Sequence, residues 1–159
     1  MNTETRKLTL VVLLAVVSIL AIQPALVHAT SQSVTIMARG SATSAVNSAS
    51  PSARIYLIGM ATNLNGGDIQ FTHLTGILQI GPVFYTLVGG QGQTNYQTNT
   101  LQLNLQVGGS NPGSLVLQGT TAISGAGYDV LFTPQQSNLA NQYSLWLYGY
   151  LRITPAPYS

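Results

Sequence analysis

The most regular pattern in the chain is a strict alternation of apolar and polar residues over residues 101–107, LQLNLQV. An alternation with a period of two places the apolar side chains on one face of a β-strand and the polar ones on the other. The polar positions are Gln102, Asn104 and Gln106, so the outward row carries amides and no charge. The segment therefore predicts a strand with one buried face and one neutral, exposed face.

Other segments of strand character are separated by turns rich in Gly, Asn and Pro. They cover residues 33–39, 54–62, 68–80, 83–90, 115–124, 125–134 and 143–154. Only residues 135–142 have the composition of a short helical turn, and no amphipathic helix is apparent. About eight strands at this spacing predict an all-β fold. Because closing the sheet removes unpaired edges, we expect a small antiparallel β-barrel first and a two-sheet β-sandwich second.

The apolar positions change parity within residues 68–80. Ile69 and Phe71 share one parity, whereas Leu74 and Leu78 have the other. A strand that keeps both sets on one face must contain an extra residue, so the pattern predicts a bulge or bend near residues 73–76.

Two segments have the composition of irregular chain. Residues 40–53, GSATSAVNSASPSA, are small and polar and predict a flexible linker. Residues 89–99, GGQGQTNYQTN, predict a loop. The expected organisation is an N-terminal strand and linker over 30–53, followed by a barrel or sandwich domain over 54–159.

Residues 1–29 have the pattern of a secretory signal peptide. Arg6 and Lys7 precede an apolar run over residues 8–22, and VHA at residues 27–29 resembles a cleavage site. The run of about 15 residues is shorter than the roughly 20 needed to span a bilayer. We expect cleavage before Thr30 or Ser31 and a secreted, extracellular or cell-surface protein; retention of the leader as a membrane anchor is the alternative.

Charge is scarce once the leader is set aside. The whole chain has 5 Lys and Arg, 3 Asp and Glu, and no Cys. Apart from tyrosines, the ionisable side chains after residue 30 are Arg39, Arg54, Arg152, Asp68, Asp129 and His73. There is no basic patch for nucleic acid and no polybasic segment for anionic lipid, so the expected membrane contact is through an uncleaved leader alone.

These ionisable side chains are too few to form a typical active site. Asp68 and Asp129 each follow glycines at the start of a strand, where an Asp commonly hydrogen-bonds turn backbone. His73 is a single histidine, no G-x-S-x-G motif is present, and a metal site needs three or four ligands. We expect no catalytic residue, no metal and no cofactor; a hydrolase using His73 and one Asp is the enzymatic alternative.

The last predicted strand has two contrasting faces. One parity carries leucines, and the other carries Trp146, Tyr148, Tyr150 and Arg152. Aromatic rows with an Arg can bind sugars or flat ligands by stacking, or form a protein interface. These four residues are the candidate binding site. The alternative is that residues 40–53 or 135–142 cover the row and make it a second small core.

Three stretches carry a family resemblance: LTGILQIGPVFYTLVGGQGQ at 74–93, LQGTTAISG at 117–125 and LWLYGYLRIT at 145–154. They resemble a pattern in uncharacterised secreted all-β proteins of archaea, in which a strand ending in Gly, a turn and a Y-T-x-x-x-G strand form a hairpin. The resemblance implies the all-β fold and implies no activity.

A neutral surface without Lys tolerates close packing against identical subunits or polysaccharide. We expect a secreted, non-enzymatic β domain with a structural or interaction role outside the cell, self-associating through residues 33–39 added as a strand to a neighbouring sheet. The alternative is a barrel that binds a carbohydrate or a small apolar ligand in its mouth or on the aromatic row.

Overall fold

The computed structural model describes residues 31–64, 66–110, 112–125, 127–133 and 143–155. They form eight strands: β1 (Gln32–Ser44), β2 (Ser52–Asn63), β3 (Ile69–Ile80), β4 (Val83–Asn95), β5 (Thr100–Val107), β6 (Gly113–Ser124), β7 (Gly127–Thr133) and β8 (Tyr143–Pro155). No helix of the described chain has the length and hydropathy needed to span a bilayer.

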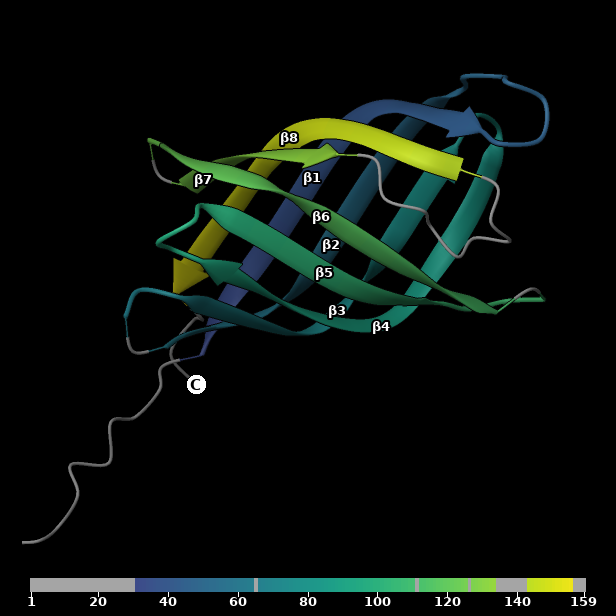
Figure 1. Ribbon diagram of the computed structural model, residues 1–159. Coiled ribbons are helices and arrows are strands. Elements are labelled where there is room, and N and C mark those ends of the chain that lie inside the picture. Colours follow the sequence, from purple (N-terminus) through teal and green to yellow (C-terminus); the bar gives the residue numbers. More distant parts are fainter. Residues whose placement is uncertain (1–30, 65, 111, 126, 134–142, 156–159) are drawn as a thin grey trace, which may run out of the picture.

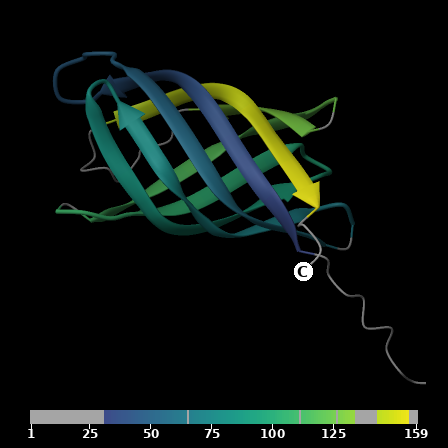
Figure 2. The ribbon, with the colours of Figure 1, turned by 180° about the vertical axis from the view of Figure 1, so that it is seen from behind.

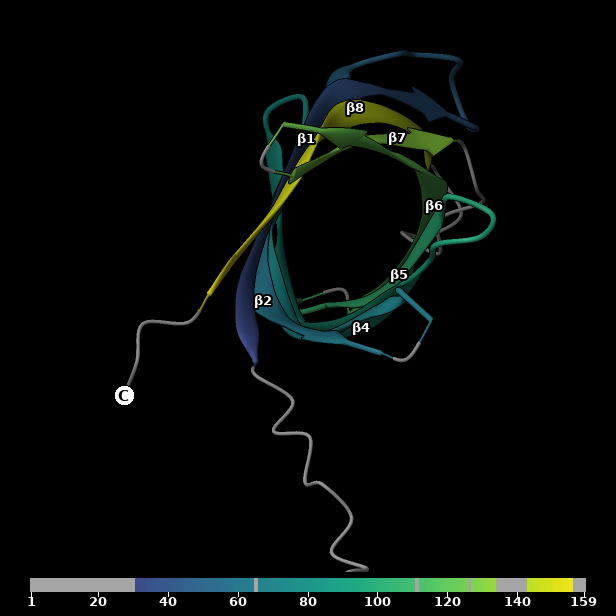
Figure 3. The ribbon, with the colours of Figure 1, turned by 90° about the vertical axis from the view of Figure 1, so that its left-hand side faces the viewer.

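Each strand pairs antiparallel with the next, and β8 pairs with β1, so the sheet closes into a barrel (Figure 1). Seen from behind, β1, β2 and β8 run side by side across one wall (Figure 2). Viewed near the barrel axis, the strands form a continuous ring (Figure 3). The expected eight-stranded antiparallel barrel is confirmed, and the sandwich alternative is wrong.

The apolar face of every strand is directed into the barrel. On β5, Leu101, Leu103, Leu105 and Val107 are buried, and the three amides between them are exposed. An eight-stranded barrel is just wide enough for side chains to fill its interior. The largest fully buried side chains include Phe71, Phe132, Ile36, Leu57, Leu74 and Leu78. The interior is therefore an aliphatic and aromatic core.

The expected bulge in β3 is confirmed at His73. Ile58 pairs with Thr75 and Met60 with Thr72, so two residues of β3 oppose Gly59 alone. His73 has a φ of 53°, in the left-handed region that an extra residue of a bulge can occupy. The shift keeps Phe71 and Leu74 both inside the core despite their opposite parity.

The linker expected over residues 40–53 is wrong, because β1 continues to Ser44 and β2 starts at Ser52. A short turn joins them, closed by hydrogen bonds from the Ala42 N–H to the Pro51 carbonyl at 2.9 Å and from the Ser44 N–H to the Ala49 carbonyl at 2.8 Å. Gly40 is required where the backbone of β8 lies close, because a Cβ there would overlap the Trp146 carbonyl oxygen. The N-terminal strand is thus part of the barrel, and the domain boundary expected at residue 54 is not present.

The loop expected over residues 89–99 is wrong for residues 89–95, whereas residues 96–99 form the turn between β4 and β5. β4 continues to Asn95 and pairs with β5 from Leu87 to Asn95, with a register shift between Leu87 and Gly89. Its glycines signal close packing: a Cβ on Gly90 would lie 2.6 Å from the Leu105 side chain. The signal peptide expected over 1–29 and the helical turn over 135–142 lie outside the described residues.

Candidate binding site

The outer surface of the barrel differs from one side to the other. On one side, large apolar side chains project into solvent from neighbouring strands β8, β1, β2, β3 and β4. We call this surface the aromatic face; it comprises Trp146, Tyr148, Tyr150, Met37, Tyr56, Ile58, Ile77 and Phe84. On β5, the exposed residues are Thr100, Gln102, Asn104 and Gln106. The outer side of β5 is therefore polar and uncharged, whereas the aromatic face is largely apolar.

The four candidate residues of the last strand all lie outside the barrel on β8. Trp146, Tyr148 and Tyr150 are 50%, 58% and 46% exposed, and Arg152 is exposed as well. Residues 40–53 do not cover them, because this segment forms the β1–β2 hairpin beside β8. Residues 135–142 lie outside the described chain. The predicted aromatic row is thus present on the surface.

A hollow of about 780 Å³ crosses the aromatic face, and we call it the outer groove. Its lining comes from six strands, β7, β8, β1, β2, β3 and β4. Tyr148 and Tyr150 contribute to the lining, whereas Trp146 and Arg152 do not. The groove therefore crosses the predicted row between its two tyrosines and leaves the ends of the row outside.

The floor of the outer groove is a row of inward-directed residues aligned across the strands. Gly149 pairs with Ala38, and Ala38 pairs with Ile55. Gly149 has no side chain to hold β8 away from β1, and a Cβ there would lie 1.8 Å from the Met37 carbonyl oxygen. Because Gly149 and Ala38 are small, the backbone of β8 and β1 can lie closer to the core at this position. The outward side chains before and after them then form the two walls of the groove.

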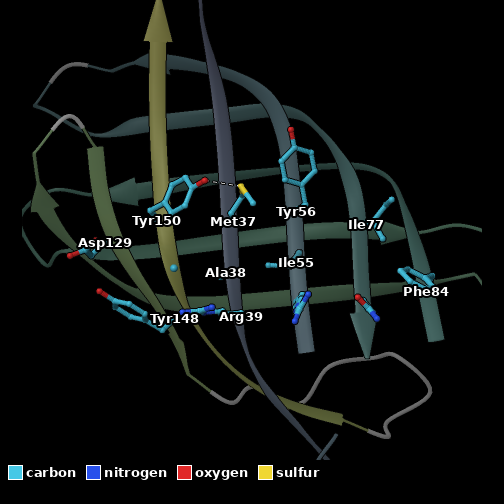
Figure 4. A pocket seen from close by; sticks show the side chains of 13 residues that line it. Met37, Ala38, Arg39, Ile55, Tyr56, Ile77, Phe84, Asp129, Tyr148 and Tyr150 are labelled. Carbon is cyan, nitrogen blue, oxygen red and sulfur yellow. Dashed lines mark hydrogen bonds between the residues drawn. The ribbon is translucent and has the colours of Figure 1, made fainter. Parts of the chain in front are cut away.

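One wall, which we call the apolar wall, consists of Tyr150, Met37, Tyr56 and Ile77, paired in that order from β8 to β3. The Tyr150 hydroxyl donates a hydrogen bond to Met37 Sδ at 2.8 Å (Figure 4). This contact holds the Tyr150 ring against β1. The wall offers apolar area with two phenol rings.

The opposite wall, which we call the cationic wall, consists of Tyr148, Arg39, Arg54, Gln79 and Phe84, paired from β8 to β4. Figure 4 shows Tyr148 and Arg39 on one side of Ala38, with Tyr150, Met37 and Tyr56 on the other. Arg39 and Arg54 are directly opposite each other on adjacent strands, and both are exposed. Among the described residues, no carboxylate forms an ion pair with either guanidinium.

Asp129 of β7 is the acidic residue of the outer groove. It pairs with Tyr150, at the β7 end of the apolar wall, and it is half-buried. Figure 4 shows it to the left of Tyr150 and Tyr148, at one end of the groove. The groove therefore carries two positive charges near its middle and one negative charge at one end.

The other candidates for chemistry lie away from this groove. Asp68 Oδ1 accepts a hydrogen bond from the Tyr96 N–H at 2.8 Å, which joins two turns at one end of the barrel. His73 Nδ1 lies 3.2 Å from Thr72 Oγ1 at the bulge. No three His, Asp or Glu side chains gather into a metal-binding group in the part of the chain that the structure describes. Asp68 and His73 therefore act locally, in a turn and a bulge.

Two further hollows differ from the outer groove in size and lining. A hollow at the end near Tyr96, Asn99 and Tyr128 has a volume of about 20 Å³, which is room for about one water molecule. A second surface hollow, of about 520 Å³, lies over β4, β5 and β6 and is lined by amides such as Gln91 and Asn104. Of these three hollows, the outer groove has the greatest volume, and it is lined by aromatic and charged side chains.

Sequence reasoning missed Arg39, Arg54, Met37 and Tyr56 as site residues. The alternation in residues 33–39 and 54–62 places them outward, but alternation does not reveal which strands lie next to each other. Their association depends on the pairing of β1 with both β2 and β8.

No protein-family model, curated protein or solved structure matches the chain. The resemblance to secreted β proteins of archaea therefore stays a prediction.

Proposed function

We propose that the chain is a secreted, non-enzymatic barrel domain with a structural or interaction role at the cell surface or outside the cell, and that the aromatic face is its contact surface. The observation that carries the proposal is the gathering of exposed aromatic and aliphatic side chains on one side of the barrel. Large exposed apolar patches mark interaction sites, because isolated soluble surfaces rarely retain them.

The acidic and histidine side chains lie apart from one another, which supports a non-enzymatic role. Asp68 is engaged in a turn, His73 in a bulge, and Asp129 lies in the outer groove. Catalytic groups need hydrogen-bond reach to one another to transfer protons. The proposed activity is therefore binding.

Self-association through the aromatic face would use side chains and not strand addition. The strand addition expected for residues 33–39 is wrong, because β1 is paired with β2 on one side and β8 on the other. A second copy would instead pack its own aromatic face against the first.

Sedimentation velocity over a range of protein concentrations tests this contact. We expect reversible association that persists at high salt, because few charges are involved. Replacing Trp146 and Ile58 with Ser should weaken it, since both lie on the aromatic face and neither lines the outer groove. Ile123→Ser is the matched control: Ile123 is on β6 and is 74% exposed. A monomer at every concentration would overturn self-association through this face.

The second candidate function is binding of a carbohydrate or small apolar ligand, and the outer groove favours it. Ligand sites commonly have volumes of about 300–1,000 Å³ and combine apolar walls with a few polar groups. The groove meets both conditions, with tyrosines on both walls and two arginines on one. The ligand would lie on the outside of the barrel, not in its mouth.

A further inference from the structure

We infer that the outer groove binds an extended chain of acidic sugars, with carboxylates at Arg39 and Arg54 and sugar faces on the tyrosines. This inference rests on the proposed ligand-binding role and names its ligand class. Three independent features of the outer groove support it: the charge of the cationic wall, the tyrosines on both walls, and the length of the groove.

The arginine pair indicates an external anion. Arg39 and Arg54 are directly opposite on β1 and β2, and like charges in this position destabilise a sheet. They are two of the three arginines in the described chain, so their placement together is not a consequence of abundant charge. No carboxylate of the described residues pairs with them. A carboxylate from a ligand would offset the repulsion and accept paired hydrogen bonds from a guanidinium.

The walls match the two-sided character of a sugar ring. A pyranose has apolar C–H faces and polar edges, and an aromatic ring can stack on such a face. Tyr150 and Tyr56 stand on the apolar wall. Arg39 and Arg54 lie on the cationic wall, on the other side of the floor residues Ala38 and Ile55. A sugar that stacks on the tyrosines would therefore direct a carboxylate at its edge toward the cationic wall.

The length of the outer groove favours a polymer over a compact ligand. The groove crosses six strands, and five spacings of about 4.8 Å give about 24 Å along the curved surface. It lies on the outside of the barrel, so a chain longer than the groove can extend past both ends. A linear polysaccharide fits this shape without an enclosed cavity.

The charge of Asp129 should affect ligand affinity in the opposite direction to the charges of the arginines. The Asp129 carboxylate lies at the β7 end of the groove, where it repels an acidic chain. Removing this charge should strengthen binding, whereas removing the arginines should weaken it. A purely structural role of these residues does not produce both changes.

The test is calorimetric titration of the purified protein with polygalacturonate, a polymer of uronic acid. We expect Arg39→Gln with Arg54→Gln to weaken binding about tenfold or more, as lost hydrogen bonds to a charged group do. Arg152→Gln is the matched control, because this arginine is exposed on β8 outside the groove; it should change the affinity less than about twofold. Asp129→Asn should raise the affinity.

A loss of binding can be distinguished from a loss of folding in this experiment. The double arginine variant removes a like-charge pair, so its midpoint of unfolding should equal or exceed that of the wild type. An affinity that is unchanged in the double arginine variant, or that falls equally in Arg152→Gln, would overturn the inference.

Two comparison polymers define the ligand class. Equal affinity for dextran, a neutral polysaccharide, would overturn the role of the anion and leave carbohydrate binding standing. Equal affinity for polyglutamate would overturn the sugar. If polygalacturonate does not bind but the protein still associates through Trp146 and Ile58, the inference fails and the proposed contact surface stands.

Discussion

At the level of single residues, Tyr85 is a titratable group that is partly buried against the core. It packs against the buried cluster from β4, near the end of the barrel where Tyr143 begins β8. Burial, and secondarily the nearby Tyr143, raises the pKa of Tyr85 above its ordinary value of 10.0. The neutral phenol is therefore favoured in the folded protein.

This shift predicts a loss of stability at alkaline pH. Below about pH 10, both the folded and the unfolded chain keep the proton, so the contribution of Tyr85 is constant. Above that pH, the unfolded chain loses the proton first, and the free energy of unfolding falls as the pH rises toward the folded pKa. Chemical unfolding at pH values from about 8 to about 12 measures this fall. Tyr85→Phe should reduce it, whereas the exposed Tyr96→Phe should not; parallel curves for all three proteins would contradict the assignment.

At the level of elements, the strands owe their tight bends to residues without side chains on the inner face. Gly149, Gly40 and Gly76 lie where the neighbouring strand's backbone would occupy the space of a Cβ. Such positions let a sheet curve into a small barrel. The same recess at Gly149 makes the floor of the outer groove.

Replacing Gly149 with Ala should therefore destabilise the barrel. The new Cβ would lie 1.8 Å from the Met37 carbonyl oxygen, which belongs to backbone and cannot move aside without shifting β1. We expect the free energy of unfolding to fall by about 1–3 kcal/mol or more, as in other overpacked sites. Gly89→Ala is the control, because its Cβ would meet only the Gln106 side chain, at 3.4 Å. Urea unfolding of both variants checks this, and equal effects would count against the bend as the cause.

At the level of the whole molecule, we expect closure of the sheet to protect the barrel from aggregation. β1 and β8 pair along their length, from Gln32 with Pro155 to Ser44 with Tyr143, so neither strand presents an unpaired edge. Exposed edges recruit strands from other chains. Closure protects the edges without charged side chains, and the barrel surface carries few charged side chains.

Deleting β1 should convert the protein into an aggregating species, because β2 and β8 would become edges. A circular permutant that joins residue 155 to residue 32 and opens the β5–β6 turn keeps all eight strands and should stay folded, since the two ends are adjacent. Light scattering and circular dichroism of the two variant proteins compare these outcomes. A soluble, folded protein without β1 would show that closure is dispensable.

Local alternation along the chain determined much of this structure. It placed Leu101 inside and Gln102 outside, predicted the phase change at His73, and put Trp146, Tyr148 and Tyr150 on the surface, because side-chain direction in a strand follows a period of two. It failed at Gly40 and Gly90, where small residues serve close packing between strands and have the same composition as a loop. Only the tertiary structure placed Arg39 opposite Arg54 and beside Tyr148. Such neighbours depend on strand register and closure, which are fixed by hydrogen bonds and core packing between distant segments and leave no local pattern in the sequence.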